Sequence, residues 1–197
     1  MSKLAVLPPR EDGFIRKKWS VSECRFLAES GLLEPGKYEL IAGEVVFKLG
    51  QDQLHIVAVT YIVAALAAIF GNKALIHQAN VGIGEIDEFN DPEPDVAVVR
   101  GELRDYLHRR PDPATDVLLI VEVANTSLKG DTTIKANIYA RHGLAEYWVV
   151  SLSNREVIVY RQPTANGYSD VQVYSTADSI VLLSAPSSSV RVADLLP

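Results

Sequence analysis

The stretch DVLLIVEVAN, residues 116–125, constrains the fold more than any other part of this chain. A short apolar run rich in Val, Leu and Ile is typical of a strand buried on both faces. Glu122 interrupts the run near its far end and, because side chains alternate along a strand, shares a face with Leu118 and Ile120. A carboxylate among such neighbours must pair, bind a cation or carry a proton. The simpler alternative is a strand-end glutamate that reaches solvent or pairs with an arginine.

The order of patterns along the chain predicts an α/β (α+β) fold, a mixed β-sheet flanked by helices with added β-hairpins. A capping box at Ser20 and Glu23 begins the first expected helix, and Gly31 ends it. The motifs G-x-G-x-x-G and G-x-x-x-x-G-K-[ST] are absent from the sequence, which disfavours a nucleotide-phosphate cradle. The expected elements are a helix over 21–30, a hairpin over 37–49 turning at Ala42-Gly43, a long helix over 51–70, strands over 74–84, 95–99 and 116–124, a helix over 130–142, a hairpin over 145–162 turning at Ser153-Asn154, and short strands thereafter.

The length of 197 residues predicts a single domain, with an added small subdomain as the alternative, and we place this domain over residues 20–197 after an N-terminal extension over 1–19. The single cysteine, Cys24, cannot form an internal disulfide, which favours a reducing compartment and predicts a cytoplasmic protein. The apolar run from Ile56 to Phe70 falls short of the roughly 18 residues that indicate a membrane span, so we expect a core or subunit-interface helix and no membrane. The formal net charge of −6 does not indicate nucleic-acid binding, although a local basic patch would still allow it.

Asp95 offers a partner for Glu122. It follows a proline that holds the chain extended and begins a short apolar strand, DVAVV. If this strand neighbours the Glu122 strand, the two acids can meet at one edge of the sheet. A divalent cation would relieve their repulsion, and Mg²⁺ is often held by one or two carboxylates and several waters. The alternative is that Asp95 only caps a turn.

Lys135 lies on the helix expected after the Glu122 strand. With Asp131 four residues earlier, it has the spacing of an ordinary helical ion pair. In a catalytic interpretation, its ammonium instead reaches a metal-bound water or the negative charge that develops on a phosphate.

Five stretches carry a family resemblance: YELIAGEVV, QLHIVAVTYIVAAL, PEPDVAVV, LLIVEVANTS and DTTIKANIYARHGLAEYWVV followed by VIVYR. Together they resemble the Uma2 (DUF820) family of the PD-(D/E)XK, restriction-endonuclease-like superfamily, from about residue 20 to the end of the chain. The resemblance implies a restriction-endonuclease-like mixed sheet and Mg²⁺-dependent hydrolysis of phosphodiester bonds, in which Mn²⁺ can substitute. DNA is the substrate it implies.

The resemblance also implies site residues. Pro94-Asp95 stands for the PD element and Glu122 for the acid of the second element, which makes Asp95 and Glu122 the expected metal ligands. The lysine position of E-x-K holds Ala124, and Lys135 on the following helix takes its place, as is usual in the family. The family often has Leu-Ser-Pro-Ser after the glutamate, where this chain has ANTS, residues 124–127.

Two further residues join the expected catalytic set. Glu44 opens the GEVV strand, where an acid is typical of the family, and His55 lies in the first turns of the long helix, where related nucleases often carry an acid or a histidine beside the metal. The alternatives are a solvated hairpin glutamate and a surface or core-edge histidine.

Basic residues are the candidate phosphate contacts. We expect the group after the Asp95 strand to rim the site. A second hypothesis is a catalytically inactive nuclease-fold module that binds nucleic acid or a protein partner, and a third is a structural homo-oligomer. A homodimer is also what a nuclease that cuts two strands would need. The candidate basic residues are Arg16, Lys17, Lys18, Arg100, Arg104, Arg109, Arg110 and Lys129.

Overall fold

The computed structural model describes residues 6–7, 14–34, 36–48, 52–78 and 80–197. Contacts divide the chain into two compact units. One comprises Met1–Gly50 and Ile83–Pro92, and the other comprises Gln51–Gly82 and Glu93–Pro197. The division into an extension over 1–19 and one domain over 20–197 stays a prediction, and residues 1–5 and 8–13 of that extension lie outside the described residues.

The first unit begins with a short antiparallel pair, β1 (Val6–Leu7) and β2 (Arg16–Lys17), followed by helix α1 (Val21–Glu29). The predicted capping box is present. The Oγ of Ser20 accepts from the amide of Glu23 at 3.3 Å, and the Glu23 carboxylate accepts from the amide of Ser20 at 3.0 Å. The helix ends where expected, since Gly31 follows with a φ of +74°.

Strands β3 (Tyr38–Ile41) and β4 (Glu44–Phe47) form the predicted hairpin. Its turn is Ala42-Gly43, with φ values of 53° and 82°. Two consecutive positive φ values define a type I′ turn, whose twist matches that of the strands it joins. The Oδ1 of Asn90 accepts from the amide of Ala42 at 2.7 Å and holds the turn.

The second unit is built on a six-stranded sheet of order β10-β9-β8-β7-β6-β5, which confirms the predicted mixed sheet. Only β7 and β8 pair in parallel, and every other neighbouring pair is antiparallel. β7 is buried almost throughout, as the apolar run predicted, and its neighbour β8 is buried throughout. The strands are β5 (Leu75–His77), β6 (Val96–Val99), β7 (Val117–Ala124), β8 (Glu146–Ser151), β9 (Glu156–Thr164) and β10 (Gly167–Ser175).

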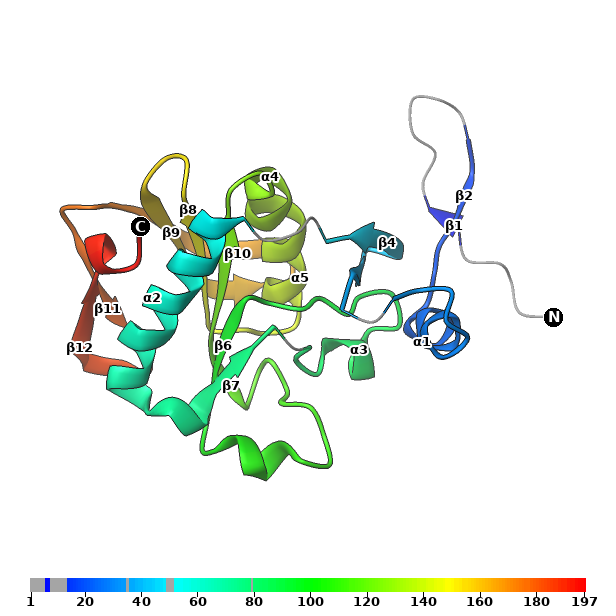
Figure 1. Cartoon of the computed structure of the whole chain (residues 1–197), viewed down its shortest axis with the longest axis horizontal. Coiled ribbons are helices and arrows are strands. Elements are labelled where there is room, and N and C mark those ends of the chain that lie inside the picture. The colour runs from blue at the N-terminus through cyan, green and yellow to red at the C-terminus, as the bar shows by residue number, and fades with distance from the viewer. Residues whose placement is uncertain (1–5, 8–13, 35, 49–51, 79) are drawn as a thin grey trace. The chain divides into compact units, whose positions relative to one another are not determined.

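Helix α2 (Gln53–Phe70) covers one face of this sheet, together with the hairpin β11 (Ser179–Leu182) and β12 (Ala185–Arg191) and the C-terminal turn η4 (Val192–Asp194) (Figure 1). Ala58, Ile62 and Leu66 pack into the core against the strands. Among the described residues, α2 is the one helix whose length and apolar composition would allow it to cross a membrane, because the helix begins three residues before the apolar run Ile56–Phe70. Its packing on the sheet accounts for the apolar character of one side.

The opposite face carries α4 (Leu128–Gly130), the π-helical turn η3 (Asp131–Lys135) and α5 (Ala136–Arg141). The sequence predicted one uninterrupted helix here. The π-helical turn inserts an irregularity that helical periodicity does not reveal. Tyr139 of α5 packs against Tyr147 of β8, with ring centroids 4.9 Å apart.

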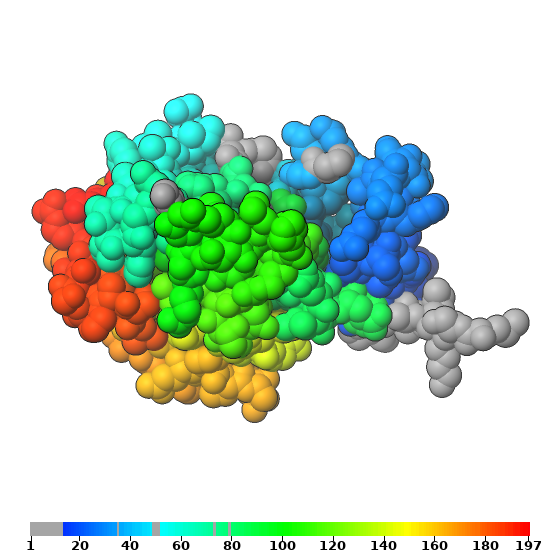
Figure 2. Space-filling view, turned by 90° about the horizontal axis from the view of Figure 1, so that it is seen from below, coloured from blue at the N-terminus to red at the C-terminus, as the bar shows by residue number. Residues whose placement is uncertain are grey.

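The predicted strand over 74–84 was too long. Strand β5 has three residues after the 3₁₀ turn η1 (Asn72–Ala74), and Ile83 begins the short helix α3 (Ile83–Ile86). Residues 100–116 connect β6 to β7 through the 3₁₀ turn η2 (Leu103–Tyr106). Figure 2 shows this connection, in green, at the front of the view.

Candidate active site

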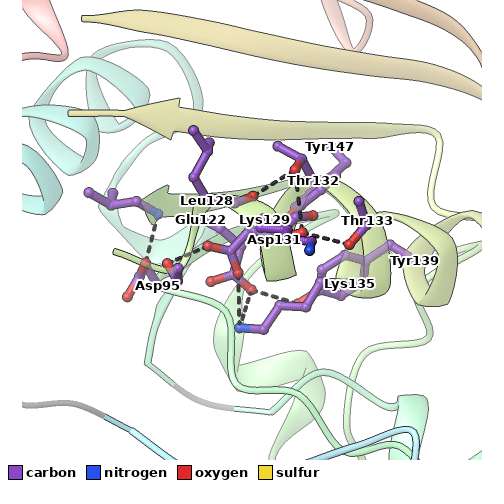
Figure 3. Close-up of polar contacts among 12 residues, drawn as sticks. Asp95, Glu122, Leu128, Lys129, Asp131, Thr132, Thr133, Lys135, Tyr139 and Tyr147 are labelled. Atoms are coloured by element: carbon purple, nitrogen blue, oxygen red, sulfur yellow. Dashed lines mark hydrogen bonds and ion pairs between the residues drawn. The ribbon is translucent and has the colours of Figure 1, made fainter. Parts of the chain in front are cut away.

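The pairing of β6 with β7 brings Asp95 and Glu122 to the same end of the sheet. Val96 lies opposite Val121, so the residue before β6 lies beside the last residues of β7. The Oδ2 of Asp95 accepts a hydrogen bond from the amide of Val123 at 2.8 Å, one residue beyond Glu122. The expectation that these two strands are neighbours is confirmed. Figure 3 shows both carboxylates at this strand end.

Glu122 is buried, with 4% of its surface exposed, on the face that carries α5. Its Oε1 accepts from the Nζ of Lys135 at 3.0 Å and from the hydroxyl of Tyr139 at 3.0 Å (Figure 3). A buried carboxylate is tolerated where charge and hydrogen bonds compensate for lost water. The alternative of a solvent-facing or arginine-paired glutamate is therefore wrong, because the partner is Lys135.

Lys135 lies between two buried carboxylates. Besides Glu122, its Nζ approaches Oδ1 of Asp131 at 3.8 Å. The Oγ of Ser127 donates to Oδ2 of Asp131 at 2.5 Å and fixes that carboxylate from the other side. The helical ion pair and the contact with Glu122 thus occur together, and only 11% of the Lys135 side chain is exposed.

His55 joins the site from the first turn of α2. Its Nε2 lies 3.2 Å from Oδ2 of Asp95. Burial lowers the pKa of His55, but the hydrogen bond and charge of Asp95 outweigh it and raise that pKa above the ordinary 6.5. Asp52, the N-cap of α2, accepts from the amide of His55 at 2.8 Å and from Nδ2 of Asn125 at 2.6 Å, which ties the helix start to the end of β7.

The structure thus brings together four of the five expected catalytic residues: His55, Asp95, Glu122 and Lys135. The fifth, Glu44, opens β4 in the first unit, and its membership of the site stays a prediction.

The expectation that the basic residues after β6 rim the site was wrong. The amide of Arg100 bonds to the carbonyl of Asp116, so the connection 100–116 leaves β6 and enters β7 at the end of the sheet away from Asp95. Two of its arginines are also paired, Arg104 with Glu102 and Arg109 with Asp116. Lys129 is an exposed basic residue of α4, which follows β7 at the site end.

The donor set suits a hard cation that is only partly enclosed by protein. The Nζ of Lys135 lies 3.0 Å from Glu122 and 3.8 Å from Asp131, and Asp95 lies beside the end of β7, where it accepts from the amide of Val123. No group of three His, Cys, Asp or Glu side chains able to enclose a metal occurs within the described ranges. Mg²⁺ needs only one or two protein carboxylates, since water and substrate phosphate complete its shell. Asp95 and Glu122 therefore fit this role.

Tyr139 is the contact that sequence reasoning missed. It lies four residues after Lys135, a spacing that places two helical residues on one face. This spacing would have allowed the sequence to predict that Tyr139 lies beside Lys135. A tyrosine in an apolar helix, however, is more often a core residue.

A chain of known structure shares this fold. The match is the crystal structure of "a putative nuclease belonging to DUF820" from Anabaena variabilis, with a TM-score of 0.67 and 18% identity over 89% of this chain and 96% of that chain. A comparison with curated proteins finds no match. The fold is therefore that of a nuclease-like α+β protein.

The family model of Uma2, described as "Putative restriction endonuclease", matches residues 27–193. The chain belongs to the Uma2 family, as the sequence motifs indicated. Family and fold together indicate a restriction-endonuclease-like nuclease.

Proposed function

We propose that this protein is a metal-dependent endonuclease that hydrolyses phosphodiester bonds in DNA. The observation that carries the proposal is the meeting of Asp95, Glu122 and Lys135 at one sheet end, with Asp95 bonded to the amide after Glu122 and Lys135 bonded to Glu122 itself. Two carboxylates at the end of a rigid sheet and a lysine on the helical segment that packs on it are the groups that a PD-(D/E)XK-type site needs.

In this proposal, Asp95 and Glu122 hold Mg²⁺, for which Mn²⁺ can substitute. The bound cation supplies Lewis-acid polarisation of the phosphate and activation of water. His55 holds the Asp95 carboxylate through Nε2, and the amide of Val123 holds the same oxygen. Fixing this oxygen from two sides limits the rotation of the ligand side chain.

Lys135 has a separate role. Its ammonium is buried beside Glu122, where little water screens its charge. From there it orients the attacking water or stabilises the negative charge that develops on the phosphate. Asp131, braced by Ser127, keeps the ammonium on this side of the helix.

We further propose that the protein acts as a homodimer, because cutting both strands of a duplex needs two such sites. Helix α2 leaves Ile56 and Tyr61 exposed, at 44% and 45%, and carries no Asp, Glu, Lys or Arg along its length. An apolar face of this kind is suited to a second copy. Sedimentation of the wild type and Tyr61→Glu tests this, with a dimer expected only for the wild type.

Plasmid cleavage tests the nuclease proposal. The wild type should nick or linearise plasmid DNA with Mg²⁺ or Mn²⁺ and lose this activity in EDTA. Glu122→Gln and Lys135→Ala should each lower the rate by about 10²–10³-fold, which is the usual loss of one charge-stabilising group. Glu156→Gln, on β9, is the control and should cleave normally.

Two results would contradict the nuclease proposal. One is equal cleavage by the wild type and Glu122→Gln, which would place the activity elsewhere or in a contaminant. The other is no cleavage by the wild type itself, which would favour the alternative of an inactive nuclease-fold module that binds nucleic acid or a protein partner.

A further inference from the structure

We infer that Tyr139 is a positioning residue for the Glu122 carboxylate in its metal-binding role. The hydroxyl of Tyr139 donates to Oε1 of Glu122 at 3.0 Å, and the ring is fully buried. This inference rests on the proposed metal-dependent site. It adds a group that belongs neither to the expected catalytic residues nor to the expected metal ligands.

The first argument is the sharing of one oxygen. Tyr139 and Lys135 both donate to Oε1 of Glu122, each at 3.0 Å (Figure 3). Two donors from different directions define the plane and rotation of a carboxylate far better than one. A carboxylate that ligates a metal is usually hydrogen-bonded in this way by an outer partner, which orients it before the ion arrives.

The second argument is the rigidity of the donor. The Tyr139 ring packs 4.9 Å from the ring of Tyr147, whose hydroxyl donates to the carbonyl of Asp131 at 3.1 Å. Tyr147 in turn lies 5.4 Å from Tyr160. Because this cluster holds the ring, the Tyr139 hydroxyl has a fixed position. The hydroxyl therefore also fixes the position of the Glu122 carboxylate that it contacts.

The third argument is the π-helical turn over 131–135. In an α-helix, residues four apart are offset by about 40° and residues eight apart by about 80°. A π-helical turn contains more residues and so rotates less per residue. It thereby offsets the drift and keeps Asp131, Lys135 and Tyr139 on one buried stripe, with exposed fractions of 4%, 9% and 0%. π-helical turns of this kind are frequent at functional sites.

The test compares two tyrosine-to-phenylalanine variants. Tyr139→Phe removes the hydroxyl that contacts Glu122. Tyr168→Phe is the matched control, because Tyr168 belongs to the same ring cluster but donates to the backbone carbonyl of Leu144 at 2.9 Å. Both lose one hydrogen bond of a largely buried phenol, and thermal melting verifies that both fold.

Calorimetric titration with Mn²⁺ is the primary measurement. Tyr139→Phe should weaken Mn²⁺ binding about 10-fold, at the low end of the usual loss for an outer partner, while Tyr168→Phe should bind as the wild type does. In the cleavage assay, the Mn²⁺ concentration for half-maximal rate should rise by the same factor, and the rate at saturating Mn²⁺ should change less than about 3-fold.

Equal Mn²⁺ affinity in Tyr139→Phe and Tyr168→Phe would overturn the inference, because a purely structural tyrosine changes only the melting temperature. No saturable heat in the wild type would overturn both this inference and the proposed function. Mn²⁺ binding by the wild type without any DNA cleavage would overturn only the proposed function, and the calorimetric comparison would still decide the role of Tyr139.

Discussion

The Nζ of Lys135 lies 3.0 Å from Oε1 of Glu122, although 13 positions in the chain separate the two residues. The contact joins a central strand to a helix on one face of the sheet. Both side chains are almost wholly buried, at 11% and 5% exposed, so each depends on the other to offset the loss of water.

Lys135→Met should therefore lower the free energy of unfolding of the metal-free protein by about 3–5 kcal/mol, the usual cost of leaving one member of a buried pair alone. Saturating Mn²⁺ should restore part of this loss, because a cation that binds the folded protein stabilises it. Urea unfolding with and without Mn²⁺ measures both effects. If Mn²⁺ raised the free energy of unfolding of Glu122→Gln as much as that of Lys135→Met, the explanation would be contradicted, because Glu122→Gln removes the charge of the proposed ligand.

Glu146 should be equally critical for stability but not for metal binding. It is fully buried and accepts from Arg161, from Nε1 of Trp148 at 3.1 Å and from the amide of Leu183 at 2.9 Å. Glu146→Ala should destabilise the protein by about 3–5 kcal/mol, because it leaves the Arg161 guanidinium without its carboxylate. Denaturant unfolding measures the loss. Asp194→Asn, in an exposed pair, is the control and should change little.

Asp116 should make the stability of the folded protein depend on pH in the acidic range. The hydrogen bond from Arg109 lowers the pKa of Asp116 below its ordinary value of 3.8, although burial opposes this. A carboxyl with a lowered folded-state pKa contributes stability above its unfolded pKa and loses it as the pH falls through the folded value. The melting temperatures of the wild type and Asp116→Asn should therefore differ at neutral pH and converge on acidification below about 3.8. A difference that is constant from neutral pH to pH 2 would contradict this.

Ala42 should be a site where a substitution stabilises the protein. Its φ of 53° is costly for a residue with a Cβ, and Asn-Gly is the preferred pair in a type I′ turn. Ala42→Asn should raise stability by about 0.5–1 kcal/mol, measured by protection of the β3–β4 amides from hydrogen exchange. Gly43→Ala should have the opposite effect, because a Cβ there would lie 2.1 Å from Cγ of Lys18.

Lys129 should contribute to DNA affinity without sequence preference. It is exposed on α4 at the site end, whereas Arg104 lies in the connection at the other end of the sheet. In EDTA, Lys129→Ala should weaken binding of several duplexes equally and reduce the slope of log K against log salt by about 0.9, the loss of one phosphate contact. Fluorescence anisotropy measures both. Arg104→Ala should leave the affinity and the salt slope unchanged. If Arg104→Ala weakened binding and Lys129→Ala did not, DNA would bind at the end of the sheet that carries residues 100–116.

Local patterns were sufficient where the determinant is local. The capping box at Ser20 and Glu23 and the Ala42-Gly43 turn depend on neighbouring residues, and both were predicted correctly. The β7 strand followed from its apolar composition. The family resemblance named Asp95, Glu122 and Lys135 as one set, whose catalytic role stays a prediction. These features need no knowledge of which distant segments meet.

Tertiary structure decided the rest, because strand register and sheet order depend on contacts between distant residues. The register of β6 on β7 put Asp95 beside the amide of Val123 and sent the arginines of residues 100–116 to the opposite end. The π-helical turn keeps Tyr139 on the same side of the helix as Lys135, where its hydroxyl contacts Glu122. The sequence therefore determined which acids and which lysine are available, and packing around β7 determined which oxygen each of them contacts.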